Sequence, residues 1–373
     1  MSRKSISTQE MAERAVLVSV DSRKDIEDWS IDSSLRELGQ LAKTAGALVV
    51  GRFSQKMERP SSTHYLGSGK LKELKDLRQE LDYDIAIIND DLTSYQQRQL
   101  EEALQVKIID RTALILDIFA RSAHTSEGKL QVELAQYQYL LPRLAGQWSH
   151  LERLGGGIGT RGPGESQIET DRRLIQNRIT RIKRQIEDVH KHRELYRRRR
   201  NKSGMSLVAL VGYTNAGKST LLNAICQANV LSEDKLFSTL DPVTRRLRLP
   251  SGKQILMTDT VGFIHNLPPL IVAAFHATLE ELKEADLLLH IVDITSPDAV
   301  NQSLTVDDIM HDLELDNKHK LTVINKIDLL TRNLHEADKI TSAIKSPPEM
   351  TVAVSAFKHW NLKELLQKIE ESI

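Results

Sequence analysis

Residues 207–219 read LVALVGYTNAGKS, and this stretch decides the fold. Its apolar first part, 207–211, has the composition of a buried strand, and the TLLNAI that follows the stretch has the spacing of a helix. Between them, residues 212–219 match the pattern G-x4-G-K-S, in the strand–loop–helix order that a phosphate-binding loop requires. This order argues against a chance match in an ordinary loop. The stretch therefore predicts an α/β domain that binds a nucleotide.

The predicted loop supplies several kinds of phosphate contact. Gly212 and Gly217 let successive backbone N–H groups turn towards a β-phosphate, and the N-terminus of the following helix adds partial positive charge. Lys218 would neutralise charge on the β- and γ-phosphates, and Ser219 would place its hydroxyl on Mg²⁺. Asn215 suggests a further hypothesis, in which a monovalent cation beside the phosphates replaces an arginine finger.

A second motif, DTVG (259–262), follows the apolar run 255–258. Asp259 would emerge at the carboxyl edge of the sheet, near the phosphate-binding loop. Its carboxylate suits the outer coordination shell of Mg²⁺, and the Gly262 N–H can bond a γ-phosphate only while that phosphate is present. The motif therefore predicts a γ-phosphate sensor.

A third motif indicates which base is bound. NKID (325–328) ends the apolar run 321–324, and SAF (355–357) follows the run 351–354. The carboxylate of Asp328 can accept hydrogen bonds from N1–H and the exocyclic amino group of guanine, where adenine offers no matching donors. Backbone N–H groups of 355–357 can reach guanine O6. We therefore expect GTP as the preferred nucleotide.

The segment FSTLDPVTR (237–245) lies between the two phosphate motifs. A threonine here is needed to complete Mg²⁺ coordination when the segment closes over the γ-phosphate, and spacing alone leaves both Thr239 and Thr244 as candidates. Phe263 stands where many GTPases carry the glutamine that orients the attacking water. Because a phenyl ring cannot hold that water, we expect slow intrinsic hydrolysis and assign no catalytic side chain.

The first 125 residues alternate short β-branched runs with amphipathic stretches, which predicts a small parallel sheet covered by helices. The loop-like residues Gly67-Ser68-Gly69-Lys70 lack the full glycine spacing of a phosphate-binding loop, and we interpret them as the start of a helix. The expected strands are 14–20, 47–53, 84–89 and 106–110, and the expected helices are 33–44, 70–81, 94–104 and 111–122.

From residue 130 the apolar positions recur in steps of four and three, as the seam between two helices requires. The steps resume after a glycine-rich loop, 155–165, so we expect an antiparallel helical hairpin with a kink at Pro142. Residues 197–204 (RRRRNKSG) are charged and then small, which indicates a linker to the next domain. The glycine-rich loop 155–165 is longer than a connection between two helices needs, and this favours a functional role over a simple connector.

Overall composition hides a strong local charge. The formal net charge of the chain is zero, but residues 171–202 hold thirteen Lys and Arg against four acids, a net charge of +9. Such a block suits a phosphate-rich partner, the alternative being a solvated helix face. One cysteine among 373 residues excludes an internal disulfide, and no apolar run is long enough to span a membrane. We expect a soluble, cytoplasmic protein that acts as a monomer.

The motifs GYTNAGKS, DTVG, NKID and SA, in this order, resemble those of the translation-factor class of small GTPases. The run GGGIGTRGPGESQIETDRR in a basic hairpin, with GYTNAGKST and FSTLDPVTRR after it, is similar to the HflX family of ribosome-associated GTPases. The similarity covers nearly the whole chain. One departure is DPVTR at 241–245, where members often read DPTTR.

The resemblance implies that Ser219 and Thr239 are the protein ligands of Mg²⁺. It also implies that the N-terminal region and the hairpin dock on the large (50S) ribosomal subunit, with the tip loop reaching rRNA, in ribosome splitting or rescue. A ribosome-biogenesis checkpoint that binds RNA is the alternative. The candidate rRNA contacts are Arg161, Arg172, Arg173, Arg178 and Arg181.

The sequence thus predicts an α/β chain in three parts: a small parallel α/β domain (1–125), a basic helical hairpin with a glycine-rich tip (126–200) and a doubly wound P-loop GTPase domain (201–373). The expected GTP-binding residues fall in the motifs named above, and they are Gly212, Tyr213, Thr214, Asn215, Ala216, Gly217, Lys218, Ser219, Phe237, Ser238, Thr239, Leu240, Asp241, Asp259, Thr260, Val261, Gly262, Asn325, Lys326, Ile327, Asp328, Ser355, Ala356 and Phe357.

Overall fold

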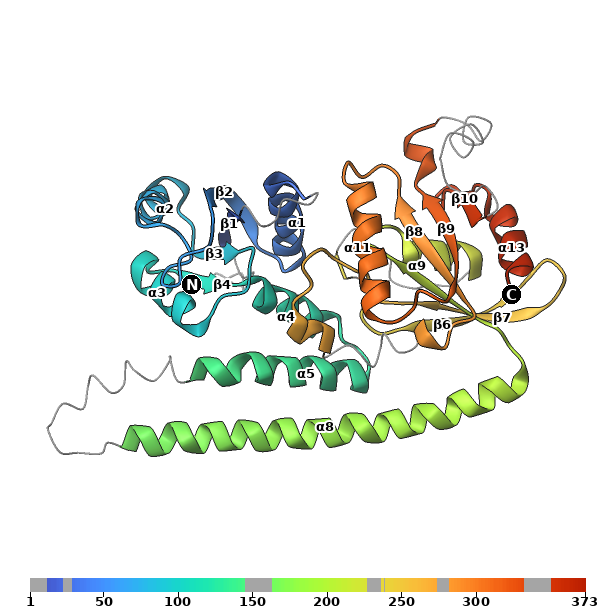
Figure 1. The fold of residues 1–373 in the computed structure, drawn as a ribbon, viewed down its shortest axis with the longest axis horizontal. Coiled ribbons are helices and arrows are strands. Elements are labelled where there is room, and N and C mark those ends of the chain that lie inside the picture. The colour runs from blue at the N-terminus through green and yellow to red at the C-terminus, as the bar shows by residue number, and fades with distance from the viewer. Residues whose placement is uncertain are drawn as a thin grey trace, which may run out of the picture. The chain divides into compact units, whose positions relative to one another are not determined.

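The computed structural model describes residues 12–22, 29–144, 163–226, 236–237, 239–273, 282–331 and 350–373; the side chains of 163–168, 190 and 192–203 are outside this description. The chain divides into two compact units, Met1–Asp117 and Ile118–Ile373, here called the N-terminal and the C-terminal unit. Figure 1 labels the elements of both units.

The N-terminal unit holds a four-stranded parallel sheet in the order β2-β1-β3-β4. This confirms the small parallel α/β arrangement expected from the alternating pattern. The elements are β1 (Arg14–Ser22), α1 (Ile31–Thr44), β2 (Leu48–Met57), α2 (Ser68–Leu81), β3 (Ile85–Ile88), α3 (Ser94–Leu104) and β4 (Lys107–Ile109), and α4 (Arg111–Ser122) continues into the C-terminal unit.

Alternation along β1 explains how the sheet is covered. Val16 and Val18 join the cluster that holds Leu74 of α2 and Leu100 of α3, whereas Leu17, on the opposite face, meets α1 at Gly39. Gly67 is the N-cap of α2, so residues 68–70 form the first turn of a helix, as expected, and not a phosphate-binding loop.

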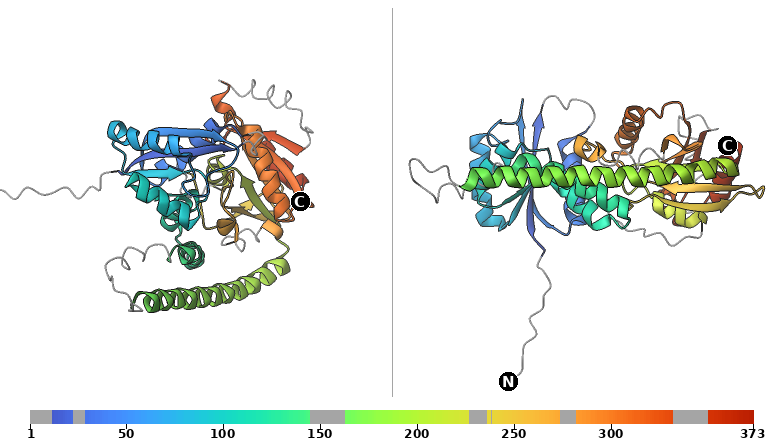
Figure 2. Two further views of the ribbon diagram at one scale, coloured as in Figure 1. Left: turned by 60° about the vertical axis from the view of Figure 1, so that its left-hand side comes forward. Right: turned by 90° about the horizontal axis from the view of Figure 1, so that it is seen from below.

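The C-terminal unit begins with the helical hairpin. α5 (Ser126–Leu140) is followed by a short 3₁₀ turn, η1 (Leu141–Arg143), which confirms a break at Pro142. α8 (Pro163–Ser203) returns antiparallel beside α5, as Figures 1 and 2 show. On α8 the less exposed positions include Ile175, Ile179 and Ile182, which is the predicted seam, and Ile182 is fully buried.

The boundaries of α8 correct one expectation. The helix runs to Ser203, so residues 197–203 are helical and not a linker. Arg and Lys are good helix formers, and no glycine or proline interrupts the run before Gly204, whose φ of +64° ends the helix. At the other end, residues 163–165 of the expected tip loop are the first turn of α8, with Pro163 at the first helical position. Residues 155–162 lie outside the described residues.

A six-stranded sheet forms the rest of the unit, in the order β10-β9-β8-β5-β7-β6. Five strands are parallel, as predicted, which confirms the doubly wound P-loop fold. The elements are β5 (Leu207–Gly212), α9 (Lys218–Cys226), β6 (Val243–Arg248), β7 (Gln254–Asp259), β8 (Leu287–Asp293), α11 (Ala299–Asp312), β9 (His319–Asn325), η2 (Ile327–Leu329), β10 (Thr351–Ala353) and α13 (Leu362–Glu371).

The edge strand β6 is the element that the sequence did not reveal. It pairs antiparallel with β7, and only Leu247 among its residues is buried. Because three of its six residues are arginines, it lacks the apolar run that marks the other strands.

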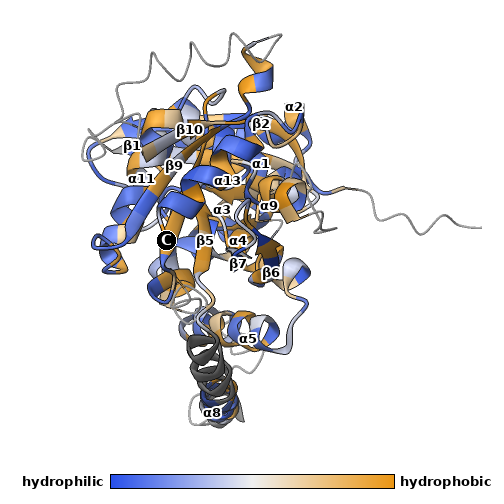
Figure 3. Cartoon of the chain, turned by 90° about the vertical axis from the view of Figure 1, so that its right-hand side faces the viewer, coloured by the Kyte–Doolittle hydropathy of each residue, from blue (hydrophilic) through white to orange (hydrophobic). Residues whose placement is uncertain are grey.

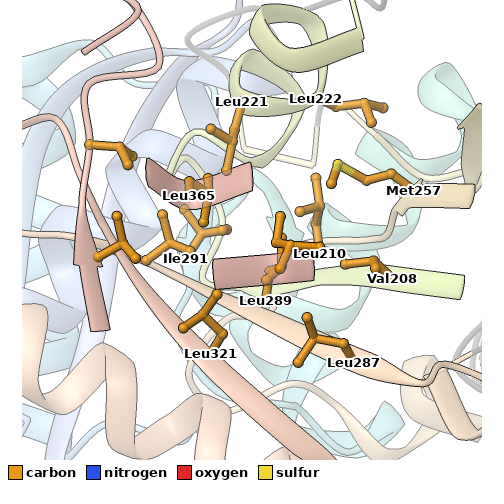
Figure 4. Close-up of a cluster of buried hydrophobic side chains, with 14 of the residues drawn as sticks. Val208, Leu210, Leu221, Leu222, Met257, Leu287, Leu289, Ile291, Leu321 and Leu365 are labelled. Atoms are coloured by element: carbon orange, nitrogen blue, oxygen red, sulfur yellow. The ribbon is translucent and has the colours of Figure 1, made fainter. Parts of the chain in front are cut away.

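The core of this sheet is continuous from strand to helix. Val208, Leu289 and Ile291 from the central strands pack with Leu221 of α9 and Leu365 of α13, as Figure 4 shows. The hydropathy colouring of Figure 3 shows β5 as hydrophobic, whereas α8 is largely hydrophilic where it is coloured. Burial at these strands holds their carboxyl ends in one rigid edge. Among the described residues, no helix combines the length and the apolar character that a membrane crossing requires.

The buried position of Ile182 yields a prediction about the hairpin. Replacing Ile182 with Ala should lower the free energy of hairpin opening by about 3 kcal/mol, because a buried side chain is lost from the α5–α8 seam. Hydrogen exchange of α5 amides should then be roughly a hundredfold faster. Leu174→Ala, at a position that is 59% exposed on the same helix, is the control and should leave exchange within about twofold. Equal effects of the two substitutions would contradict the seam.

Candidate functional site

A cleft lies at the carboxyl edge of β5, where the phosphate-binding loop leads into α9. Nine predicted residues line it, and a tenth, Thr220, was not predicted although it directly follows Ser219 in the first turn of α9. The cleft is lined by Thr214, Asn215, Gly217, Lys218, Ser219, Thr220, Phe237, Thr239, Thr260 and Gly262.

The loop geometry depends on left-handed backbone at two positions. Asn215 has a φ of +61° and Gly217 a φ of +95°. At Gly217 a Cβ atom would collide with Nδ2 of Asn325, so the close approach also requires glycine there. Left-handed residues in such a turn aim successive N–H groups inward, which makes a concave site for an anion.

Three oxygen-bearing side chains meet beside the loop. Ser219 Oγ lies 2.8 Å from Thr239 Oγ1 and donates to Asp259 Oδ2 at 2.6 Å, and Thr239 Oγ1 donates to the same oxygen at 3.0 Å. The other candidate, Thr244, lies on β6 with its hydroxyl 2.8 Å from that of Thr258. The structure therefore brings Thr239, and not Thr244, to Ser219 and Asp259.

Two opposite charges are buried at the cleft. Lys218 is 6% exposed, and its Nζ donates to the carbonyl oxygens of Gly212 and Tyr213 at 3.0 and 2.8 Å. Burial lowers the pKa of Lys218 to about 8, although the nearby carboxylate of Asp259 opposes this shift. Burial likewise raises the pKa of Asp259, with Lys218, Ser219 and Thr239 opposing it. Burial thus disfavours the charged form of each side chain relative to water. A negative charge near Lys218 or a positive charge near Asp259 would offset this effect.

The orphaned oxygen of Asp259 tests whether a cation fits. Asp259 is fully buried, and among the residues that the structure describes its Oδ1 has no hydrogen-bond partner. Hydroxyl and carboxylate oxygens are the donors that Mg²⁺ prefers, and a divalent cation beside Ser219 and Thr239 would offset the burial of the carboxylate. The donor set of the site therefore fits Mg²⁺.

The DTVG motif is held against the phosphate-binding loop. The Phe263 N–H donates to the Gly212 carbonyl at 3.1 Å, and the Phe263 carbonyl accepts from the Thr214 N–H at 2.8 Å. A Cβ atom at Gly262 would come within 2.9 Å of both Lys218 Nζ and Thr214 Cα, so glycine is needed for this approach. The Phe263 ring is 1% exposed and lines a separate apolar cavity. It offers nothing polar to a water molecule in the cleft.

The NKID and SAF motifs are brought together by Asn325. Its Nδ2 donates to the carbonyl of Ala216 at 2.9 Å, and its Oδ1 accepts from the N–H of Ala356 at 3.1 Å. Ser355 Oγ donates to Asp328 Oδ1 at 2.6 Å, which orients that carboxylate. The structure thus places the predicted base-binding residues next to the phosphate-binding loop.

Other predicted residues of these motifs have different surroundings. Lys326 pairs with Asp293 at the end of β8, at 2.7 Å, a partner that sequence reasoning missed because no local pattern marks it. Ile327 is fully buried, and Phe357 is 73% exposed.

The remaining predicted residues lie in several different surroundings. Leu240 and Val261 are buried beside the cleft, and the carboxylate of Asp241 faces the N-terminus of α5. Arg178 of α8 donates to Glu133 of α5 at 2.7 Å. Arg172, Arg173 and Arg181 are exposed on α8, whereas Ser238 and Arg161 lie outside the described residues.

Comparison with known proteins gives matches along most of the chain. Three family models match: "GTP-binding GTPase N-terminal" at residues 32–120, "GTP-binding GTPase Middle Region" at 122–200 and "50S ribosome-binding GTPase" at 207–326. GTPase HflX of Caldanaerobacter subterraneus subsp. tengcongensis is 50% identical over 361 residues, which are 97% of this chain and 81% of that protein. GTPase HflX of Escherichia coli is 43% identical over 320 residues, which are 85% of this chain and 74% of that protein.

The crystal structure of SsGBP in complex with GDP is similar in fold, with a TM-score of 0.51 and 25% identity, over 96% of this chain and 98% of that one. The sheet order and the glycine-shaped phosphate loop define the chain as a P-loop GTPase, an enzyme that binds and hydrolyses GTP. More narrowly, the chain belongs to the HflX family of GTPases.

The buried charge of Lys218 predicts a pH dependence in the nucleotide-free protein. Because burial lowers the pKa of Lys218 to about 8, keeping it charged destabilises the fold at pH values below 8. This penalty fades as pH rises from about 8 to 10.5, the ordinary pKa of a lysine side chain. Lys218→Met should therefore melt at a higher temperature than the natural chain at pH 7, and the difference should shrink over that window, as measured by calorimetry.

The matched control is Lys363→Met, which removes an exposed lysine of the same unit. It should show no such trend with pH. A lower melting temperature for Lys218→Met at pH 7, or a pH-independent difference, would contradict the electrostatic description of the cleft.

Proposed function

We propose that this GTPase associates with the large ribosomal subunit and acts in ribosome splitting or rescue, with the γ-phosphate of GTP controlling the helical hairpin. The observation that carries the proposal is the fusion of a GTPase cleft to a long helix with exposed basic residues in one compact unit. The match of residues 207–326 to a family described as 50S ribosome-binding GTPases supports it.

The roles proposed at the phosphates follow from the chain's own groups. The N–H groups of the loop and of the first turn of α9 would hold the β-phosphate, and Lys218 would turn from its two carbonyl acceptors to the phosphate oxygens. Its charge would then face phosphate oxygens as well as the carboxylate of Asp259. Gly262, which already approaches Lys218 Nζ, is placed to donate its N–H to a γ-phosphate.

Ser219 and Thr239 would hold Mg²⁺, with Asp259 accepting hydrogen bonds from the ligands around it. When bound, the cation would neutralise negative charge on the phosphates. The protein's part is to keep the two hydroxyls together: Asp259 Oδ2 accepts from both, at 2.6 and 3.0 Å. That arrangement requires the segment around Thr239 to stay folded against β7.

Hydrolysis should be slow in the isolated protein. The side chain of Phe263 is buried in apolar surroundings, so it cannot orient water for attack on the γ-phosphate. We propose that binding to the large subunit supplies or orders the missing group, so that turnover rises on the ribosome.

Asp328 is the residue proposed to select guanine. Asp328→Asn should weaken GTP binding about a hundredfold, because an amide cannot accept both guanine donors. Binding of xanthosine triphosphate should strengthen, since xanthine carries an acceptor at position 2. Fluorescence titration with both nucleotides measures the switch. Asp308→Asn, at an exposed carboxylate of α11, is the control, and unchanged guanine preference in Asp328→Asn would contradict the assigned role.

The hairpin would contribute the contact with RNA. Arg172, Arg173 and Arg181 are exposed on α8, whereas Arg178 is engaged by Glu133 and would serve mainly to hold the two helices together. Exposed guanidinium groups bind phosphates by replacing condensed counterions, so the affinity should fall steeply with salt.

Replacing Arg172, Arg173 and Arg181 with Ala should weaken binding to purified large subunits and lower the slope of log affinity against log salt by about 2 to 3, because three phosphate contacts are lost. Sedimentation over a range of KCl concentrations measures the slope. The control replaces three exposed cations with Ala: Arg246 of β6, Lys253 just before β7 and Lys363 of α13. Identical slopes in the two triple variants would remove the hairpin from the RNA interface.

Light scattering then decides between the proposed role and a checkpoint in ribosome biogenesis. A splitting factor should lower the scattering of intact ribosomes in the presence of GTP, whereas a biogenesis checkpoint would bind subunits without dissociating the ribosome.

A further inference from the structure

The segment that carries Thr239 has a second attachment, at Asp241. Oδ2 of Asp241 accepts hydrogen bonds from the backbone N–H groups of His124 and Thr125, both at 2.8 Å, and Oδ1 accepts from the hydroxyl of Thr125. Negative charge is stabilised at a helix N-terminus by the unpaired N–H groups and the helix dipole. The carboxylate of Asp241 therefore faces the start of α5, the first helix of the hairpin.

The start of α5 is shaped to receive this carboxylate. Thr125 is the N-cap of the helix, and its Oγ1 accepts from the N–H of Gly128 at 3.0 Å while donating to Asp241. A Cβ atom at Gly128 would collide with Asp241 Oδ1, so any larger residue there would push the carboxylate away. Two residues of α5 are thus fitted to one residue of the GTPase domain.

A second contact lies on the other side of Thr239. The ring of Phe237 meets that of Phe119 edge to face, with the centroids 4.7 Å apart and both rings almost fully buried. Phe119 belongs to the last turns of α4, shortly before His124. The two rings and Phe263 line the same small apolar cavity. Both flanks of Thr239 are therefore bound to the chain that leads into the hairpin.

One short segment, 239–241, therefore contacts both the cleft and the start of α5. Thr239 lies against Ser219 and Asp259, and Asp241 is only two residues away, a span of at most about 7 Å of chain. Asp241 cannot leave the start of α5 by several ångströms without pulling on Thr239. Conversely, a shift of α5 would displace the hydroxyl from the cleft.

We infer that Asp241 and the N-terminus of α5 form a latch, in which Asp241 is a positioning residue that sets Thr239 for Mg²⁺ and the γ-phosphate. GTP with Mg²⁺ would favour the closed latch. GDP needs no contact from Thr239, so its binding would not change the equilibrium between the closed and the open latch. By linkage, a partner that binds one position of α5 more tightly changes the affinity for GTP, and GTP changes the affinity for that partner by the same factor. The inference deepens the proposed function, because it names the contact through which the nucleotide and the hairpin communicate.

The test uses the full chain with nucleotides and Mg²⁺ alone. Thr125→Val removes the hydroxyl on the hairpin side of the latch, at a residue that does not line the cleft. With Mg²⁺ present, the affinity for a non-hydrolysable GTP analogue should fall about tenfold, the usual loss for one charge-assisted hydrogen bond at an exposed site, while the GDP affinity stays within twofold. Thr125→Ser should restore the natural affinity.

Three further variants make the result specific. Asp241→Ala removes all three hydrogen bonds and should lower the affinity for the GTP analogue at least as much as Thr125→Val does. The double variant should be no worse than Asp241→Ala alone, because the Thr125 hydroxyl then has no carboxylate left to bind. Thr93→Val removes the N-cap hydroxyl of α3 in the other unit and should leave both affinities unchanged. Hydrogen exchange gives a readout without catalysis: the GTP analogue should protect the Gly128 amide more than GDP does, and Asp241→Ala should abolish the difference.

Parallel losses of GTP-analogue and GDP affinity in Thr125→Val would overturn the latch, and so would no loss at all or additive losses in the double variant. Because no ribosome takes part, these outcomes are distinct from a failure of subunit binding, which would leave the latch intact and remove only the proposed partner.

Discussion

Burial of two opposite charges, Lys218 and Asp259, at the carboxyl edge of one sheet is the constraint on which the site depends. Removing a charge from water costs free energy unless partners replace the water. Here each side chain compensates the burial of the other only in part, because burial lowers the pKa of Lys218 and raises that of Asp259 despite their attraction. The glycine-shaped loop brings backbone N–H groups to the same edge, and Ser219 and Thr239 bring hydroxyls. The cleft therefore suits a triphosphate and a cation, whose charges would complement those already buried.

The same constraint offers a route by which a change in the cleft would reach the hairpin. Thr239 lies beside Ser219 only when its segment packs against the end of β7. The same segment contacts the chain that leads into α5, through Phe237 on Phe119 and through Asp241 on Thr125. Packed rings and a capped helix end favour one discrete arrangement over a continuous range. A change at the γ-phosphate is thereby expected to act on the base of a hairpin whose second helix carries exposed arginines.

Most of the fold could be predicted from local pattern, and the misses have physical causes. Buried strands such as β5 and β8 are apolar throughout, so their sequence identifies them, whereas β6 buries little and reads as an exposed segment. The run 197–203 is polar, and polar residues suit both a linker and a solvated helix, so composition could not place the end of α8. In the site, spacing could not separate Thr239 from Thr244, because the choice depends on which of them lies on β6. The contact between Asp241 and Thr125 joins residues 116 positions apart and has no local signature.

The central claim is that the γ-phosphate controls the interaction of the hairpin with a ribosomal partner. The most direct measurement is co-sedimentation of the full chain with purified large subunits in the presence of GTP, GDP and a non-hydrolysable GTP analogue. The account predicts that more protein pellets with the analogue than with GDP, at every salt concentration at which binding is measurable. Equal amounts in all nucleotide states would contradict it.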